Sequence, residues 1–370
     1  MKIAMIGQKY VPSREGGVEV VVEQLSTNLV NKGNEVTIFN RRRKQYPKIS
    51  EYKGCKIENI FTIDSKALDA TVYSFFATLK AKRIAKKGCF DILHFHAEGP
   101  CLFLNLLPNR KHRKYKIVVT IHGLDWQRGK WGGLATKVLL KGEQNAVKYA
   151  DEIIVLSKSA QEYFKSKYNR DTIVIPNGVS EPVFHDPDII NKKWGLTKNS
   201  YILFVARIVP EKGLHYLIQA WKGLDKTVKG DKKLVIAGSS SHSEDYCNSI
   251  LEMVKDDNSI IMTGFAEEQI LQELYSNAFL FVLPSDIEGM PMSLLEAMSY
   301  GNTCLVSDIP ENKDIIGDNC YSFKKGDIPD LIKKLSFILF KNNNEEKCNS
   351  RNLPWNEVSD TILDVYRGKK

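Results

Sequence analysis

The stretch "SDIEGMPMSLLEAMSYG", residues 285–301, carries the pattern from which the fold of the chain is inferred. Two glutamates, Glu288 and Glu296, stand eight positions apart on either side of a Gly-Met-Pro turn. Pro291 suits the first turn of a helix and Gly301 suits the position after its end, which predicts a helix over 291–300 with Glu288 in the preceding loop. At about 1.5 Å per residue, the two glutamates are about 12 Å apart along the helix axis.

This separation disfavours an acid–base pair acting on one bond, because the paired carboxyl groups of glycosidases lie about 5–9.5 Å apart. Two carboxylates at the longer distance suit two separate groups rich in hydroxyls. An anion between those groups would lie at the helix N-terminus, where free N–H groups and the helix dipole favour negative charge. A nucleotide sugar has this layout, since its sugar and its ribose are joined by a diphosphate.

Around this stretch, short apolar runs rich in Val, Ile and Phe alternate with segments of helical period, which predicts repeated β-α units and parallel sheets. A helix is expected over 18–31 in the first half, and ligands are expected at the carboxyl ends of the strands. The expected strands of the first half are 2–6, 35–39, 56–61, 91–95, 117–121, 152–156 and 172–175. Those of the second half are 201–205, 233–237, 259–262, 279–283, 303–306 and 320–323.

The length of 370 residues suits two domains. Helical and strand periodicity is lost around Pro182 and Pro187, and a new strand begins near residue 201, so the boundary is expected between 180 and 197. We therefore predict an N-terminal domain over 1–180 and a C-terminal domain over 181–370. The last helix, about 354–368, has an apolar stripe that could close either domain and could pack back on the first.

Composition excludes several classes of protein. With 43% hydrophobic and 26% charged residues, the chain is typical of a globular protein. No apolar run approaches the ~20 residues of a membrane span, and the start is too soon interrupted for a secretory signal, so we expect a cytoplasmic protein. The seven cysteines include no Cys-x-x-Cys pair, and reduced thiols are expected rather than a disulfide framework or a zinc site.

Charge is distributed unevenly along the chain. Residues 1–180 hold 31 Lys and Arg against 16 Asp and Glu, a net charge of +15, whereas residues 181–370 hold 22 against 28, a net charge of −6. Basic clusters lie at 41–44, 82–87 and 110–116. We therefore expect an anionic partner near the first half.

The Glu, seven residues and Glu within "EGMPMSLLEAMSYG" resemble the signature of the retaining glycosyltransferases of family four. The resemblance covers essentially the whole chain. It implies an α/β GT-B fold, in which two Rossmann-like domains with parallel sheets face each other across a cleft, the first on the acceptor side and the second binding the nucleotide sugar. It also implies that Glu288 contacts the hydroxyls of the donor sugar and that Glu296 holds the ribose hydroxyls.

The segment "FVARIVPEKG" adds Arg207 and Lys212, which match the Arg/Lys pair of that family. Two cations at a strand end suit a diphosphate and would stabilise the charge that develops as it leaves. Ala206 stands where the family commonly has Gly, which leaves the pair untouched. The alternative is an ordinary surface ion pair of either cation with Glu211.

Further donor-binding residues follow from the resemblance. Residues Gly238, Ser239, Phe265 and Ala266 end strands where the family binds the diphosphate and the base. The start of the predicted helix adds Gly289, Met290 and Pro291 to this set.

The segment "QKYVPSREGGVEVVVEQL" places Gly16 and Gly17 between the first strand and its helix. Paired glycines let backbone amides approach an anion closely. In the family, a Gly-Gly loop here faces the donor phosphates and the acceptor, although a simple turn is the alternative. The spacing is not Gly-x-Gly-x-x-Gly, which counts against NAD.

The segment "VVTIHGLDWQRGKWGG" places His122 at the end of a predicted strand. The matching histidine of the family lines the donor sugar pocket, so a donor-positioning role is expected for His122, with a packed or solvated histidine as the alternative. Asp125 and Trp126 are the expected acceptor-side residues. Arg128 and Trp131 could extend an acceptor platform.

Metal ligation is not expected. His94 and His96 lie on one face of a predicted strand and could be two metal ligands, but no third ligand with suitable spacing follows. The patterns at Asp186-x-Asp188 and Asp286-x-Glu288 mimic an Asp-x-Asp metal motif in the wrong context. The resemblance implies a reaction without metal or other cofactor, in which the donor, expected to be a UDP-sugar, is a substrate.

The sequence thus predicts a retaining hexosyltransferase that transfers a sugar to a lipid-linked glycan during synthesis of capsule, O-antigen or a similar polysaccharide. Because no carboxylate nucleophile is apparent near His122, front-face displacement is expected. The basic first half fits peripheral docking on the anionic inner face of a membrane. Residues 72–87 could form an amphipathic basic helix for that purpose, or an ordinary helix that covers the sheet.

Two alternatives remain open at this point. A sugar-nucleotide epimerase or a sucrose-type synthase would share the GT-B fold. A basic nucleic-acid-binding protein would explain the charge of the first half, although the sequence holds no recognised nucleic-acid motif.

Overall fold

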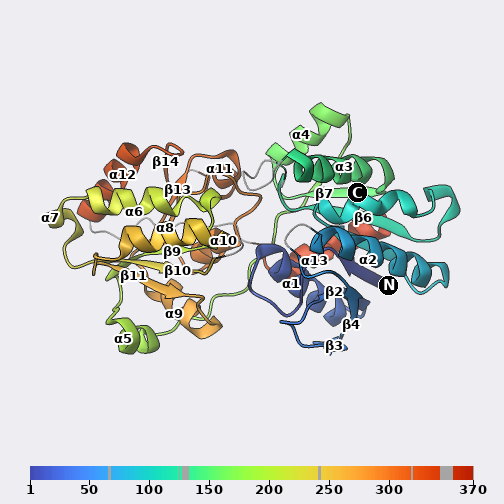
Figure 1. Cartoon of the computed structure of the whole chain (residues 1–370), viewed down its shortest axis with the longest axis horizontal. Coiled ribbons are helices and arrows are strands. Elements are labelled where there is room, and N and C mark those ends of the chain that lie inside the picture. Colours follow the sequence, from blue (N-terminus) through green and yellow to red (C-terminus); the bar gives the residue numbers. More distant parts are fainter. Residues whose placement is uncertain are drawn as a thin grey trace. The chain divides into compact units, whose positions relative to one another are not determined.

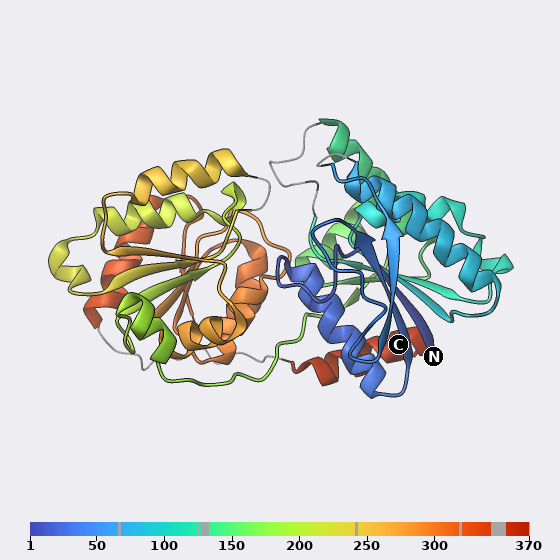
Figure 2. The ribbon, with the colours of Figure 1, turned by 60° about the horizontal axis from the view of Figure 1, so that its bottom comes forward.

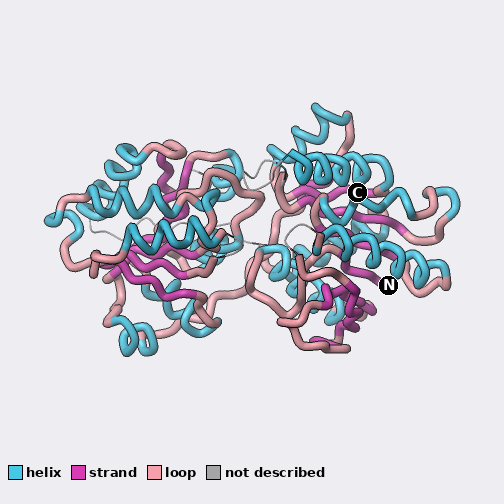
Figure 3. The backbone as a smooth tube through the Cα atoms, viewed as in Figure 1, coloured by secondary structure: helices cyan, strands magenta, loops and turns pink. Residues whose placement is uncertain are grey.

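The computed structural model of the chain describes residues 1–65, 68–124, 126, 133–240, 243–317, 320–341 and 353–369. The chain folds into two compact units (Figure 1), one made of Met1–Gly178 with Leu353–Lys370 and the other of Val179–Asn352. The first unit ends two residues before the expected boundary at 180. The last segment of the chain belongs to this first unit and not to the second. Each unit is built on one sheet (Figure 3).

The sheet of the first unit has eight strands in the order β3-β4-β2-β1-β5-β6-β7-β8. Its strands are β1 Lys2–Ile6, β2 Glu35–Arg42, β3 Glu51–Tyr52, β4 Cys55–Phe61, β5 Ile92–His96, β6 Lys116–Ile121, β7 Glu152–Val155 and β8 Ile173–Val174. All neighbouring strands are parallel except β3 and β4. The seven strands expected from the sequence are confirmed. β3 was not expected, because two residues are too few to show a strand period.

Helices cover both faces of this sheet. They are α1 Gly17–Asn31, α2 Asp69–Lys86, η1 Gly99–Leu106, η2 Arg110–His112, α3 Gly133–Tyr149, α4 Lys158–Tyr168 and α13 Trp355–Arg367. Figure 2 shows α1 and α13 on one face and α2 and α3 on the other. The first helix, predicted over 18–31, is confirmed within one residue.

The sheet of the second unit has six parallel strands in the order β11-β10-β9-β12-β13-β14. They are β9 Tyr201–Val205, β10 Lys233–Ala237, β11 Ile260–Gly264, β12 Leu280–Leu283, β13 Cys304–Ser307 and β14 Tyr321–Phe323, so the six predicted strands are confirmed. The helices are α5 Asp188–Trp194, η4 Pro210–Lys212, α6 Leu214–Gly223, α7 Lys226–Lys229, α8 Glu244–Val254, α9 Glu268–Asn277, α10 Met292–Ser299, α11 Pro310–Ile316 and α12 Ile328–Lys341.

The central strands are buried on both faces, as parallel sheets between helix layers require. In β9, consecutive residues Ile202, Leu203 and Phe204 are fully buried, and they divide between the two apolar clusters that lie on opposite faces of the sheet. These strands show no alternation of apolar and polar residues, because both of their faces are buried. Continuous apolar runs in the sequence therefore identified them correctly.

The cysteines only partly follow the expectation of reduced thiols. Among the described residues, five are free thiols: Cys55, Cys89, Cys101, Cys247 and Cys304. Cys320 is disulfide-bonded, so the expectation is wrong for that residue. Burial raises the pKa of the Cys55 thiol to about 12, which is the behaviour of a packing residue and not of a reactive thiol.

Part of the basic charge of the first unit is used inside the fold. Arg41 and Arg43 both pair with the buried carboxylate of Asp69, at 2.6 and 2.5 Å. Thr62 Oγ1 also donates a hydrogen bond to this carboxylate, at 2.9 Å. Burial by itself would raise the pKa of Asp69, but the hydrogen bonds and charges of Arg43 and Arg41 outweigh it, and the pKa is lowered. The cluster therefore ties the end of β2 to the first turn of α2.

Replacing Asp69 tests this assignment. We expect Asp69→Asn to lower the free energy of unfolding at pH 7 by about 3 kcal/mol, because it leaves two buried guanidinium groups without their carboxylate. Since the folded pKa is lowered, the contribution is complete above the unfolded pKa of about 4 and is lost as the pH falls through the folded value. Urea unfolding at several pH values measures the difference between the two proteins, which should shrink in acid.

The control is Asp64→Asn, which removes an exposed carboxylate in the same connection and should change stability by less than about 0.5 kcal/mol. Equal effects of the two variants, or a difference that does not depend on pH, would show that Asp69 does not anchor the helix.

Candidate functional site

The second sheet reverses its strand order between β9 and β12. These strands are hydrogen-bonded neighbours, whereas β10, which follows β9 in the sequence, lies on the other side of β9. The loops after β9 and β12 therefore leave the sheet side by side and lead to different helices. Such a switch point is the usual ligand site of an open parallel sheet.

The two loops are held together by backbone contacts. The Asp286 N–H donates to the carbonyl oxygen of Glu211 at 2.9 Å. Gly213 has a φ of +65°, and a Cβ at this position would clash with the carbonyl oxygen of Pro284. A glycine is therefore required where the loop after β9 turns into α6.

An ion pair joins the two loops at the same place. Lys212 Nζ lies 2.5 Å from Glu288 Oε1, and the two side chains are only 15% and 6% exposed. The sequence predicted both residues as site residues but did not predict that they touch. The alternative of a surface pair between Lys212 and Glu211 does not describe this contact.

Glu288 is fixed by residues that the sequence analysis did not identify. Ser285 Oγ donates to Glu288 Oε1 at 2.6 Å. Ser307, at the end of β13, donates to the carbonyl oxygen of Ser285, and Asn312 Nδ2 donates to Ser307 Oγ at 3.1 Å. The only signal for the two serines was a small hydroxyl residue close to the end of a strand, and Asn312 had none. The network fixes the position of one buried carboxylate from three elements.

A further carboxylate lies close to this network. Burial raises the pKa of Glu311, at the start of α11, and the charges of Asp314 and Glu288 raise it further. Glu311 was not predicted as a site residue either. Its effect on the site is to add negative charge beside Glu288.

Glu296 lies on α10, where it accepts a hydrogen bond from Tyr275 Oη to Oε2 at 3.1 Å. Tyr275 belongs to α9 and is almost completely buried. Burial, followed by the charge of Glu296, raises the pKa of this phenol well above its usual value, so Tyr275 stays protonated and donates. The predicted helix over 291–300 is confirmed as Met292–Ser299, with Pro291 at its N-cap.

The ends of β9, β10 and β11 form one edge. The Ile208 N–H donates to the Ser239 carbonyl oxygen at 2.9 Å, and the Gly238 N–H donates to the Gly264 carbonyl oxygen at 2.8 Å. Gly238 has a φ of +157°, and a Cβ there would clash with the Ala206 carbonyl oxygen. The structure thus places the loop of Arg207 beside Gly238 and Ser239.

The other predicted donor residues continue this edge. Phe265 and Ala266 follow β11 directly, and the Phe265 side chain is exposed whereas Ala266 is half-buried. Gly289 and Met290 are half-buried and Pro291 is buried, in the loop that leads into α10. The second unit thus brings most of its predicted residues to the carboxyl ends of neighbouring strands.

In the first unit, Gly16 is the N-cap of α1 and Gly17 is its first residue. The buried Glu19 side chain folds back over this loop, and its Oε1 accepts a hydrogen bond from the Lys9 N–H at 2.9 Å. A carboxylate beside Gly16 opposes an anion there. The role of the Gly16-Gly17 loop at the donor phosphates stays a prediction.

His122 follows β6 and is half-buried, and its Nε2 lies 3.0 Å from Nδ1 of His96. His94 contacts Tyr366 Oη through Nδ1 and Thr120 Oγ1 through Nε2, both at 2.7 Å. Burial, with a smaller effect of His122, lowers the pKa of His94 to about 3, and burial lowers the pKa of His96 well below its usual value. Both strand histidines are therefore neutral and bonded to protein groups.

The hydrogen bonds of His94 and His96 decide whether these two rings can bind a metal ion. The rings of His94 and His96 serve protein partners, and among the residues that the structure describes no three His, Cys, Asp or Glu side chains are placed to hold a metal ion. A reaction without metal stays a prediction.

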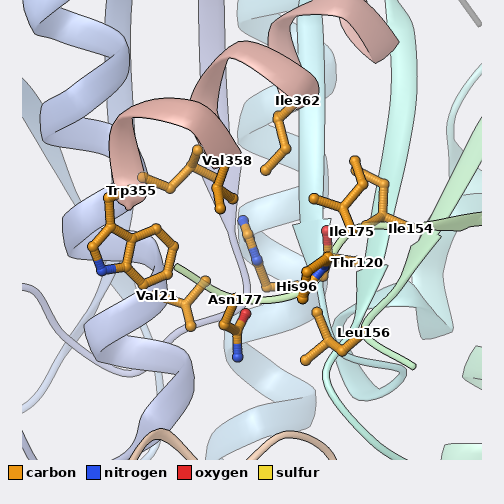
Figure 4. Close-up of a pocket in the computed structure, with 12 residues that line it drawn as sticks. Val21, His96, Thr120, Ile154, Leu156, Ile175, Asn177, Trp355, Val358 and Ile362 are labelled. Carbon is orange, nitrogen blue, oxygen red and sulfur yellow. The ribbon is translucent and has the colours of Figure 1, made fainter. Parts of the chain in front are cut away.

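A small cavity adjoins His96 between the sheet and α13 (Figure 4). Thr120 and Asn177 also line it, and Val358 and Ile362 face it from α13. Its volume is about 10 Å³, against several hundred Å³ for a typical small-molecule site. This cavity is part of the packing under α13 and is too small for a sugar.

Trp126 is held by protein groups. Its Nε1 donates to Glu143 Oε2 at 3.0 Å, and the fully buried Glu143 on α3 also accepts from Tyr163 Oη at 2.8 Å and from Lys167 Nζ at 3.0 Å. The Lys167 ammonium lies 5.2 Å from the centre of the Trp126 ring. Glu143 was not predicted, because nothing in the sequence connects α3 to this loop.

The remaining acceptor-side predictions are not decided by the structure. Asp125, Arg128 and Trp131 lie outside the described residues. The role of Trp126 in an acceptor platform stays a prediction, and its fixed position ties the loop after His122 to α3 and α4.

The chain matches two family models in succession. Residues 15–181 match the model described as Glycosyltransferase Family 4, and residues 186–353 match the model described as Glycosyl transferases group 1. Together the two models cover almost all of both units.

Known proteins of similar sequence agree with these matches. An uncharacterized glycosyltransferase of Methanocaldococcus jannaschii is 27% identical over 99% of this chain and 98% of its own length. The UDP-Gal:alpha-D-GlcNAc-diphosphoundecaprenol alpha-1,3-galactosyltransferase of Escherichia coli is also 27% identical, with 77% of each chain covered.

Solved structures show the fold. The sucrose-phosphate synthase of Thermosynechococcus elongatus has a TM-score of 0.78 at 19% identity, covering 99% of this chain and 98% of that one. HepE of Anabaena in complex with UDP and glucose has a TM-score of 0.79 at 15% identity, covering 100% of both chains. The chain has the GT-B fold, with two α/β domains that are each built on a sheet of parallel strands, except for the antiparallel edge strand β3 in the first.

Proposed function

Because the chain belongs to the glycosyltransferases that join a Family 4 domain to a group 1 domain, we propose that it transfers a hexose from a UDP-sugar to a glycan hydroxyl with retention of configuration. The observation that carries this proposal is the Lys212–Glu288 pair at the switch point of the second sheet, followed by Glu296 on α10. Lys212 suits the diphosphate of a nucleotide sugar, Glu288 suits its sugar, and Glu296 on α10 suits its ribose.

The side chains at this point act through position and charge. Lys212 and Arg207 hold the diphosphate, whose negative charge grows as it leaves the sugar. Glu288, fixed by Ser285, accepts hydrogen bonds from sugar hydroxyls, and Glu296, fixed by Tyr275, accepts them from the ribose.

The chemistry needs no nucleophile from the protein. In a front-face displacement, the bond from the sugar to the phosphate breaks while the bond to the acceptor oxygen forms on the same side. The departing phosphate takes the proton of the acceptor hydroxyl. Two cationic side chains at the diphosphate support a reaction without a resident metal.

Relatives support the choice of donor and acceptor class. The name of the Escherichia coli relative gives a UDP-linked donor and a diphosphoundecaprenol-linked acceptor, and HepE of Anabaena was solved with UDP and glucose. We extend this to the present chain as a UDP-sugar donor and a lipid-linked glycan acceptor, in the synthesis of a surface polysaccharide such as capsule or O-antigen.

An enzyme with a lipid-linked acceptor must bind at a membrane surface. Helix α2 carries exposed apolar and basic side chains that suit such binding. Its inner face is lined by Tyr73, Ala77 and Ala81, which are fully buried. Its two phenylalanines point outward instead, with Phe75 and Phe76 37% and 41% exposed. An ordinary sheet-covering helix has the reverse arrangement.

The outward apolar side chains form one patch. Phe76 contacts Phe61 at the end of β4 and Phe75 contacts Phe103 on η1, with ring centres 5.4 and 5.3 Å apart. Leu79 extends the patch along the helix and is also exposed. We call Phe61, Phe75, Phe76, Leu79 and Phe103 the α2 patch.

The α2 patch continues into basic residues. Arg83 and Lys86 lie one and two turns beyond Leu79 on the same helix face, and both are exposed, as is Lys87. Aromatic side chains followed by cations fit an anionic bilayer surface, where rings enter the interface and cations meet phosphates. Among the described helices, none has the length and apolar character of a membrane span, so the proposal is peripheral docking at the inner face.

The alternatives from the sequence remain distinguishable. The likeness to sucrose-phosphate synthase keeps a sucrose-type synthase of the same fold as the second candidate. A sugar-nucleotide epimerase would convert a UDP-sugar without acceptor, whereas a transferase would only hydrolyse it slowly. A nucleic-acid-binding role has less support, because part of the basic charge is paired within the fold.

Nucleotide binding tests the donor site. We expect calorimetry in the presence of EDTA to show binding of UDP in preference to GDP, dTDP and CMP. Glu296→Ala should abolish it, and Tyr275→Phe should weaken it by about fivefold, the effect of losing one hydrogen bond.

The control is Tyr201→Phe, which removes a buried hydroxyl that donates to the Leu274 carbonyl oxygen at 2.7 Å and does not contact Glu296. It should lower stability and leave UDP affinity unchanged. If no nucleotide binds, or if Glu296→Ala binds UDP as well as the natural chain does, the proposed donor site is wrong.

Vesicle co-sedimentation tests the α2 patch. We expect the protein to bind vesicles with anionic phosphatidylglycerol at low salt more strongly than neutral phosphatidylcholine vesicles. The double variant Phe75→Ser/Phe76→Ser should lose most of this binding, because it removes the apolar side chains that enter the interface. Lys86→Glu/Lys87→Glu should lose it as well, through charge.

The matched control is Phe337→Ser/Phe340→Ser, which removes two exposed phenylalanines from α12 of the second unit. It should bind like the natural chain. Equal binding by all variants would refute the membrane surface, and a dimer in solution that is lost in Phe75→Ser/Phe76→Ser would assign the patch to a second copy of the chain.

A further inference from the structure

The first unit ends at Gly178, and residues 180–187, without helix or strand, lead from it to α5. We call residues 180–187 the connecting segment. Its Val183 N–H donates to Oη of Tyr300, the residue after α10, at 3.3 Å, and the same hydroxyl donates to the Val183 carbonyl oxygen at 3.3 Å. Burial raises the pKa of Tyr300, so the phenol keeps the proton that it donates. One side chain thus pairs with both backbone groups of Val183.

Further contacts hold the connecting segment against α9 and the end of α10. The Phe184 ring meets the edge of the Tyr300 ring, with centres 5.3 Å apart, although Phe184 is 63% exposed. The His185 N–H donates to Ser276 Oγ on α9 at 3.1 Å, and Asn277 Nδ2 donates to the His185 carbonyl oxygen at 2.9 Å. The connecting segment is therefore attached through three successive residues.

Tyr300 also contacts the tyrosine that serves the proposed nucleotide site. Its ring stacks on the Tyr275 ring, with centres 5.5 Å apart and an interplanar angle of 26°. Tyr275 Oη lies 3.1 Å from Glu296 Oε2 and 3.3 Å from the Ser293 carbonyl oxygen. The phenol has one proton for these two acceptors, so the orientation of its ring decides how much of the hydrogen bond goes to Glu296.

The Tyr300 side chain thus joins the connecting segment to the site. Its ring meets Phe184 and Tyr275, and aromatic pairs of this kind favour defined ring positions. If the connecting segment detaches, Tyr300 loses the contacts that hold its ring against Tyr275. A ligand that fixes Glu296 in turn favours the attached segment, because the coupling of two sites is reciprocal.

We propose that Tyr300 is a positioning residue of the nucleotide site, which keeps Tyr275 in the orientation that donates to Glu296 and is itself held by the connecting segment. The inference rests on the proposed function, in which Glu296 accepts hydrogen bonds from the ribose. It goes further by making the attachment of the connecting segment a determinant of ribose recognition. Every residue of this network belongs to the second unit.

A measurement specific to the ribose separates positioning from a general effect on folding. The affinities of UDP and 2′-deoxy-UDP, which differ by one hydroxyl, are compared by calorimetry on the full chain. We expect the natural chain to prefer UDP by at least about tenfold, the effect of a hydrogen bond to a carboxylate. Tyr300→Ala should reduce this preference by about fivefold, because it removes the aromatic pair that orients Tyr275. Tyr300→Phe keeps the stacked ring and should retain the preference.

Hydrogen exchange of the Val183 amide, followed by NMR, tests the part played by the connecting segment. UDP should slow this exchange in the natural chain, because binding at Glu296 favours the attached segment. Phe184→Ala removes an edge contact of Tyr300 and should lower the preference for UDP over 2′-deoxy-UDP by about twofold. The matched control is Phe337→Ala, which removes a similarly exposed phenylalanine that meets Tyr321 edge-on, and it should leave both measurements unchanged.

The outcomes separate the inference from the proposed function. A preference that falls in Tyr300→Ala and is retained in Tyr300→Phe supports the positioning role. Equal weakening of UDP and 2′-deoxy-UDP in Tyr300→Ala assigns the side chain to folding alone and overturns that role. An unchanged preference in Phe184→Ala, with no effect of UDP on Val183 exchange, overturns the link to the connecting segment. If the natural chain binds neither nucleotide, the proposed function itself fails and the inference falls with it.

Discussion

The pairing of β9 with β12 is the constraint on which the candidate site depends. It brings two loops together that are far apart in the sequence, and it forces a glycine at 213, where a side chain would strike the Pro284 carbonyl oxygen. Lys212 and Glu288 then form an ion pair with little exposure to solvent. Such a pair is maintained only if the surrounding hydrogen bonds hold both charges in place, and the chain from Ser285 through Ser307 to Asn312 supplies them on the carboxylate side.

Carboxylates buried in the first unit are also held by several partners, and there they connect elements of the fold. Asp69 and Asp151 each pair with several donors and join helices to strands, and Glu143 joins α3 to α4 and to Trp126. Part of the basic charge of the first unit is neutralised in this way. The cations that stay exposed on α2 lie beside phenylalanines that the packing of the helix turns outward, so charge and apolar surface meet at one place.

The sequence revealed the elements better than their contacts. Thirteen strands followed from apolar runs, and the helix Met292–Ser299 followed from Pro291 and Gly301, because burial on both faces and helix ends have local signatures. The bond between His96 and His122 depends on the pairing of β5 with β6, and the ion pair depends on strand order, which periodicity does not encode. The sequence also did not predict which face of α2 is exposed, since a repeat of apolar residues does not say which side of a helix meets the sheet. Ser285, Glu143 and Glu311 carry no motif and became visible only through their partners.

Hydrogen–deuterium exchange of the full chain with and without UDP shows whether the switch point of the second sheet binds the nucleotide. We expect slower exchange in the backbone amides of 206–213 and 285–296, where the two loops and the start of α10 lie, and little change at the edge strands β3 and β8. Protection confined to other segments, or no protection at UDP concentrations that saturate binding, would contradict this assignment of the nucleotide site.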